Sequence, residues 1–238
     1  NIAIGYDAGK SMTDNNSNIV IGYQSFISAD AGESNNIVIG ESAGSDINDT
    51  NSDDNIIIGK DAGIGGAAAM IGCVVIGKDA MNSTLSNAQT GTIAIGSSAL
   101  TALTTGAGNV AIGYQAGEDL TDEANNTLIG YQAGKNANGA GSTYIGQGAG
   151  IGASTGADTD NVAVGKDSLG AIEDGTNNTA VGKAAGNTVT SGSNNTVIGK
   201  SANVSAGSST NQTAIGYGTT GTGDNEIALG NTSVSAIK

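Results

Sequence analysis

A short motif recurs along the whole chain and limits the folds available to it. The string "NIVIGYQS" begins at Asn18, and close variants follow as "NVAIGYQA" at Asn109 and "NTLIGYQA" at Asn126. Fourteen copies are spaced by 14 to 19 residues, a period typical of one turn of a β-solenoid and too short for helical-repeat or propeller units. With the motif glycine as position zero, the copies are centred on Gly5, Gly22, Gly40, Gly59, Gly77, Gly96, Gly113, Gly130, Gly146, Gly165, Gly182, Gly199, Gly216 and Gly230.

The composition suits thin repeated coils better than one thick core. The 238 residues include 40 Gly and no Pro or Trp, and aromatic residues make up 3% of the chain, so little large apolar volume is available. No apolar period of 3.6 residues is present, which favours strands over helices. We predict an all-β parallel β-solenoid of about fourteen coils, continuous over residues 1–230, with residues 231–238 leading out of the array.

The strand preceding each motif glycine presents two faces. Position −1 is Ile, Val or Leu in every copy and position −3 is Ile, Val or Thr, so both rows share one face. We predict that this face lines the interior and that position −2, which carries no charge, faces outward as a seam that identical chains cover. The predicted interior ladder is Ile4, Ile21, Ile39, Ile58, Ile76, Ile95, Ile112, Ile129, Ile145, Val164, Val181, Ile198, Ile215 and Leu229. The predicted oligomer seam contains Val20, Val38, Ile57, Val75, Leu128, Tyr144 and Val197.

Three further positions have structural interpretations. The glycine is predicted to turn the chain and to reverse which face points inward, because position +1 shares the strand parity of −1 but is polar or aromatic. Position +3 is Ala, Ser or Thr, which suits a tight interior. Position −4 is often Asn, as at Asn18, Asn36 and Asn55, and these amides could form a ladder along the coils. The polar stretches between copies are predicted to be outer loops.

The repeat also suggests a family. The pattern N-x-[AVI]-[IV]-G-x-x-[AS], carried by "NIAIGYDA", "NVAVGKDS" and "NTAVGKAA", resembles the head repeats of YadA-type trimeric autotransporter adhesins. Strings such as "AIGYQAG" are similar to repeat arrays of bacteriophage tail fibres, and "IALGNTSVSAIK" is similar to the segment before a self-cleaving trimerisation chaperone in such fibres. The resemblance implies a left-handed parallel β-roll that associates as a parallel homotrimer, outside a cell or on a virion.

Charge and residue types narrow the function. The net charge is −14 with Lys as the only cation, and no long apolar run is present, which argues against nucleic-acid binding and membrane insertion. Without His or Arg, and with scattered carboxylates, no catalytic or cofactor site can be assembled, so we predict a non-enzyme without a cofactor. We expect the structural shaft of an extracellular or virion fibre that carries host attachment. The alternative is an adhesive head module that binds a host-surface glycan, matrix or a protein receptor directly.

Candidate sites each have a simpler structural explanation. Tyr and Lys recur at position +1. This row could be a glycan-binding strip, or it could reflect the stacking of like neighbours between coils. The acidic stretches 49–55 and 158–160 could bind Ca²⁺, but solvated loop charge is the simpler interpretation and we predict no metal site. Cys73 replaces the Asn of position −4 and is interpreted as an inert substitution. Ice binding would need an outward Thr ladder, whereas Thr at −3 is predicted to face inward. The +1 ladder is Tyr6, Tyr23, Lys60, Lys78, Tyr114, Tyr131, Lys166, Lys183, Lys200 and Tyr217.

Overall fold

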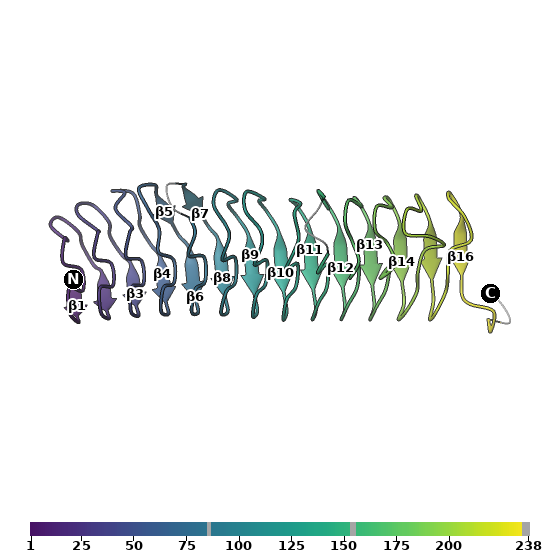
Figure 1. The fold of residues 1–238 in the computed structure, drawn as a ribbon, viewed down its shortest axis with the longest axis horizontal. Helices are drawn as coiled ribbons and strands as arrows, with labels where there is room; N and C mark the ends of the chain where they lie inside the picture. Colours follow the sequence, from purple (N-terminus) through teal and green to yellow (C-terminus); the bar gives the residue numbers. More distant parts are fainter. Residues whose placement is uncertain (85–86, 153–155, 235–238) are drawn as a thin grey trace. The chain divides into compact units, whose positions relative to one another are not determined.

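The protein is an all-β parallel β-solenoid with two compact units. The computed structural model describes residues 1–84, 87–152 and 156–234, so the end of the predicted terminal segment, 235–238, lies outside the described residues. Unit 1 is Asn1–Asn125 and unit 2 is Asn126–Lys238. Within each unit the motif strands lie side by side in chain order (Figure 1), and the described residues contain no helix.

Each motif strand has three residues and pairs in parallel with the next. In unit 1 the predicted stack of isoleucines is confirmed, because Ile21 pairs with Ile39, Ile39 with Ile58 and Ile58 with Ile76. The motif strands of unit 1 are β1 (Ile2–Ile4), β2 (Ile19–Ile21), β3 (Ile37–Ile39), β4 (Ile56–Ile58), β6 (Val74–Ile76), β8 (Ile93–Ile95) and β9 (Val110–Ile112). A separate parallel pair joins β5 (Met70–Ile71) to β7 (Gln89–Thr90).

Unit 2 repeats the same arrangement. Its strands pair in the same register, with Thr179 opposite Thr196 and Val181 opposite Ile198. The strands are β10 (Thr127–Ile129), β11 (Thr143–Ile145), β12 (Val162–Val164), β13 (Thr179–Val181), β14 (Thr196–Ile198), β15 (Thr213–Ile215) and β16 (Ile227–Leu229).

The motif glycine packs directly against the glycine of the neighbouring coil. Gly22 has a φ of +143°, and a Cβ placed on it would lie 2.3 Å from the carbonyl oxygen of Gly40. The predicted corner is therefore present, but the predicted reversal of faces does not occur at the glycine, because both position −1 and position +1 face outward. The reversal follows at position +2, where residues such as Asp61 (φ +53°) and Ser98 (φ +58°) are left-handed. Position +3 then points inward, as predicted, with Ala62 and Ala99 fully buried.

The prediction of which strand face is interior was wrong. The middle residue of each motif strand from β2 to β15, at position −2, is buried, so these residues cannot form an oligomer seam. This correction applies to Val20, Val38, Ile57, Val75, Leu128, Tyr144 and Val197. Position −1 faces outward instead, half-buried at Ile21, Ile39, Ile58, Ile76, Ile95, Ile129 and Val164. It is exposed at Ile4, Ile112, Ile145, Val181, Ile198, Ile215 and Leu229.

The sequence contains a signal for the correct face that the prediction did not use. Where the residue at position −2 is small, the residue on the opposite side of the coil is large, and the reverse. Leu103 and Leu120, at position +7, accompany Ala94 and Ala111 at −2. Conversely, Leu128 at −2 accompanies the small Ala137 at +7. All of these side chains are buried. A fixed interior volume explains this exchange, whereas the uniform Ile row at −1 meets no such limit.

Positions −2 and +7 both lie beside position +4 inside a coil. In unit 2, a Cβ placed on Gly186 would lie 3.3 Å from the Cβ of Ala180 and 3.7 Å from Cγ2 of Val189. Ala180 is at −2 and Val189 at +7 of the same coil, and both are fully buried. The interior of this coil therefore contains residues of the strand and residues of the loop.

The asparagines at position −4 form the predicted amide ladder. The Oδ1 atom of Asn36 accepts the backbone N–H of Asn55 at 3.0 Å and its Nδ2 donates to the carbonyl of Ser52 at 2.8 Å. In unit 2, Asn178 and Asn195 repeat both contacts. Each amide thus satisfies buried backbone groups of its neighbouring coil. The members with such contacts are Asn1, Asn18, Asn36, Asn55, Asn109, Asn126, Asn161, Asn178 and Asn195.

Candidate interaction surfaces

An uncharged apolar face runs along the outer side of the strands in each unit. We call the outward residues at positions −3 and −1 the apolar face. In unit 1 both rows are aliphatic throughout, from Ile2 and Ile4 to Val110 and Ile112. Ile19 and Ile37 are half-buried. An apolar surface that recurs on consecutive coils marks an interaction site more strongly than scattered exposed residues do.

The apolar face changes chemistry in unit 2. Position −1 stays aliphatic, and Val181 and Ile215 are 38% and 39% exposed. Position −3, however, becomes Thr in five of the seven strands of this unit. These residues are Thr127, Thr143, Thr179, Thr196 and Thr213, and all are half-buried on the outer side. The Thr row faces outward, so the prediction that it faces inward, which spoke against ice binding, was wrong.

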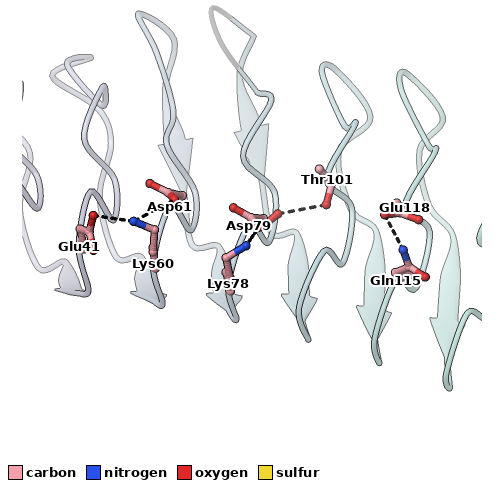
Figure 2. A network of polar contacts seen from close by, with 8 residues as sticks. All are labelled: Glu41, Lys60, Asp61, Lys78, Asp79, Thr101, Gln115 and Glu118. Carbon is pink, nitrogen blue, oxygen red and sulfur yellow. Dashed lines mark hydrogen bonds and ion pairs between the residues drawn. The ribbon is translucent and has the colours of Figure 1, made fainter.

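The lysines of the +1 ladder pair with carboxylates. In unit 1, Nζ of Lys60 lies 2.5 Å from Oε1 of Glu41 on the preceding coil and 3.8 Å from Oδ2 of Asp61. Nζ of Lys78 lies 2.6 Å from Oδ2 of Asp79. Figure 2 shows that the contact of Lys60 with Glu41 joins two coils, whereas the contact of Lys78 with Asp79 lies within one coil.

The same network includes contacts that do not involve lysine, and the pKa values of its lysines are raised. The Thr101 hydroxyl donates to the carbonyl of Asp79, and Gln115 donates to Glu118 (Figure 2). The hydrogen bond with Glu41 raises the pKa of Lys60, and that with Asp79 raises the pKa of Lys78. Because these groups are exposed, such pairs contribute little to stability.

The tyrosines of the +1 ladder lie on the surface and contact their neighbours. The rings of Tyr6 and Tyr23 are stacked with centroids 5.5 Å apart and planes inclined by 13°. Nζ of Lys200 lies 5.6 Å from the ring centroid of Tyr217. The arrangement fits simple stacking between like neighbours, and a glycan-binding role for the row stays a prediction.

A few ionisable groups are buried in the coils. The Tyr144 hydroxyl donates to Oδ2 of Asp158 at 2.6 Å, and burial, followed by the charge of Asp158, raises the pKa of Tyr144 well above its usual value. Cys73 occupies the asparagine ladder, with its backbone N–H on Asn55 and its thiol pKa raised by burial. These contacts give the groups structural roles inside the coils.

The acidic stretches do not converge on a common point. Within residues 1–84, 87–152 and 156–234, no group of three or more His, Cys, Asp or Glu side chains is placed to hold a metal ion. In the predicted stretch 49–55, Asp49 instead accepts hydrogen bonds from Asn51, and Asp53 accepts the backbone N–H of Ser34 at 2.6 Å. Loop carboxylates thus serve as local acceptors that fix loop geometry.

Comparison with known proteins adds no family assignment. A scan against models of protein families and a search of curated proteins each found no match for this chain. Among the described residues, no helix is long and apolar enough to cross a bilayer. The β-solenoid fold therefore stands on the structure, while the family suggested by the repeats stays a prediction.

Proposed function

We propose that this chain is a structural shaft segment of a fibre, formed when copies of the chain associate in parallel along the apolar face. The observation that supports this most is the continuity of that face within each unit. Both rows lack charge on every motif strand, although the chain has a net charge of −14. Elsewhere like charges would repel neighbouring copies, so the apolar face is the surface on which they can meet.

A second copy is a well-matched occupant for this surface. The aliphatic side chains recur once per coil at the spacing of adjacent strands, about 4.8 Å. Another copy carries the same spacing, so that side chains of one copy can fit between those of the other along the whole row, as in coiled-coil packing. A partner without this period would match only a few coils.

The finer features of the proposal come from the repeat sequence. The resemblance to YadA-type heads and phage fibres supports three copies per shaft, a left-handed roll, and a location outside the cell or on a virion. A non-enzymatic role fits the catalytic residue types that the sequence lacks. Such a shaft would place an attachment module at a distance from its anchor.

The test of this proposal is the molar mass of the purified chain by light scattering over a range of concentrations. The proposed shaft predicts three times the mass of a single chain, stable on dilution to low micromolar concentration. A single-chain mass throughout that range would reject the proposal. Added salt should not weaken association, because apolar contacts hold the copies together and salt screens the repulsion between their negative charges.

An adhesive role is the second candidate, and the exposure of the +1 tyrosines favours it. Tyr6 and Tyr217 are 68% and 67% exposed, and amphipathic rings suit glycan contacts. Because such contacts are shallow and repeated, binding would depend on avidity. A glycan array probed with the assembled protein distinguishes the two roles. The shaft predicts no selective binding, whereas graded loss of binding in a Tyr6→Ser, Tyr217→Ser variant would support adhesion.

A further inference from the structure

The two units carry different outer rows at position −3. In unit 1 this row contains seven aliphatic residues. In unit 2 it contains five threonines, interrupted by Val162 and ended by Ile227. Position −1 stays aliphatic in both units, so the change is confined to one row of the apolar face. It is also the clearest departure from uniformity on that face.

The threonine hydroxyls are available for contacts with another copy. Within the described residues, none of the five hydroxyl groups has a hydrogen-bond partner. Each residue is opposite its equivalent on the adjacent strand, apart from the interruption at Val162. Unit 2 therefore presents a regular row of donors and acceptors beside a row of aliphatic side chains.

We infer that the threonine row makes association of the copies selective, so that unit 2 pairs with unit 2 and unit 1 with unit 1. This inference rests on the proposed self-association. A uniform aliphatic face would tolerate displacement by one coil or inverted pairing, because every coil would offer the same contacts. If unit 2 of one copy met unit 1 of another, the hydroxyls would be buried against isoleucines.

Buried hydroxyls without partners oppose such a mismatch. When like units meet, each threonine faces another threonine and the hydroxyls can satisfy one another. A single polar position in an apolar seam sets register in coiled coils by the same physical effect. The threonine row thus supplies orientation, while the aliphatic rows supply most of the apolar contact.

The test uses the full chain and asks which labelled sites of two copies come close together. Like sites lie in the same unit of both copies, and unlike sites lie in different units. Cys73→Asn, which fits the asparagine ladder, removes the native thiol, and a single cysteine replaces Glu41 in unit 1 or Lys183 in unit 2. Both positions are exposed and lie beside the apolar face at +1. Donor-labelled and acceptor-labelled copies are refolded together, and energy transfer is measured for 41 with 41, 183 with 183, and 41 with 183.

The parent chain should give strong transfer between like sites and weak transfer between unlike sites. In the variant with Val at Thr127, Thr143, Thr179, Thr196 and Thr213, assembly should persist and the ratio of like-site to unlike-site transfer should fall toward one. A matched control replaces five exposed loop threonines with Val and should keep the parent ratio. These loop residues are Thr13, Thr50, Thr105, Thr121 and Thr210.

The possible results separate this inference from the proposed function. A five-valine variant that assembles with the parent ratio would overturn the inference and leave the shaft proposal intact, as would equal like-site and unlike-site transfer in the parent. A parent chain of single-chain mass would overturn both. Slowed or reshaped growth of ice crystals by that single chain would then indicate that ordered water, not a second copy, occupies the threonine row.

Discussion

At the scale of single residues, the motif glycine is fixed by its neighbour on the next coil. The sequence predicted a turn at this position, but not the close approach of two backbones. Along unit 1, a Cβ on Gly5, Gly22, Gly40, Gly59, Gly77 or Gly96 would lie 2.3 to 2.5 Å from the next glycine carbonyl. Such a contact is shorter than van der Waals packing allows, so the coils would have to move apart.

This contact predicts different costs for two alanine substitutions in unit 1. Gly22→Ala should destabilise the fold by roughly 3 kcal/mol or more, because steric overlap adds to backbone strain. Gly91→Ala should cost only about 1 kcal/mol, because Gly91 has a φ of +63° but a Cβ added to it would meet no atom within 4 Å. Urea unfolding midpoints measure both, and equal shifts would argue against glycine stacking.

Glu33 is a buried carboxyl that sequence patterns did not reveal. Its Oε2 accepts Nδ2 of Asn15 at 2.6 Å, while Oε1 has no partner among the described residues. Burial, with a contribution from Asp30, raises the pKa of Glu33 above 4.5. Ionisation is therefore easier in the unfolded chain than in the fold, so the fold loses stability as pH rises through this range.

Glu33→Gln should consequently stabilise the protein near neutral pH. Well below pH 4.5 the carboxyl is protonated in both states and the advantage of Gln should vanish. Urea midpoints of parent and variant at the two pH values provide the measurement. A variant that gains nothing near neutral pH, or gains equally at acidic pH, would show that the burial of this carboxyl does not limit stability.

At the scale of elements, the asparagine ladder joins one coil to the next. Oδ1 of Asn178 accepts the backbone N–H of Asn195 at 3.0 Å, and its Nδ2 donates to the carbonyl of Gly192 at 2.8 Å. Asn178→Ala should cost about 2 to 4 kcal/mol, because it leaves buried backbone groups unsatisfied.

Asn187→Ala is the matched control, because Asn187 makes an exposed contact with Asn203 at 2.7 Å. Its loss should cost less than about 1 kcal/mol. Chemical denaturation compares the two variants. Similar losses of stability would contradict a special role of the ladder in joining coils.

Strands, register and the ladder were predictable because they depend on local pattern. Three-residue strands, the stack of Ile21 on Ile39, and the small interior residues at +3 all follow from period and residue size. The inner face was predicted wrongly, because Val38 and Ile39 are equally apolar and the pattern alone does not distinguish them. The informative signal was the exchange of size between position −2 and position +7, as in Ala94 with Leu103 and Leu128 with Ala137.

At the scale of the whole molecule, the proposed association depends on which strand face is outward. Two adjacent residues on β3 distinguish the predicted outward face, at position −2, from the observed one, at position −1. Val38 is fully buried inside its coil, whereas Ile39 is half-buried on the apolar face. An aspartate at Val38 would bury a carboxylate in the coil and cost several kcal/mol. An aspartate at Ile39 would remain hydrated until another copy covered it.

The most direct test therefore compares Val38→Asp with Ile39→Asp by circular dichroism and light scattering at one concentration. Ile39→Asp is predicted to keep the β-sheet spectrum of the parent and to fall to the mass of a single chain. Val38→Asp is predicted to lose the spectrum or to unfold at a clearly lower temperature. An Ile39→Asp protein that stays assembled, beside a folded but dissociated Val38→Asp protein, would contradict the account.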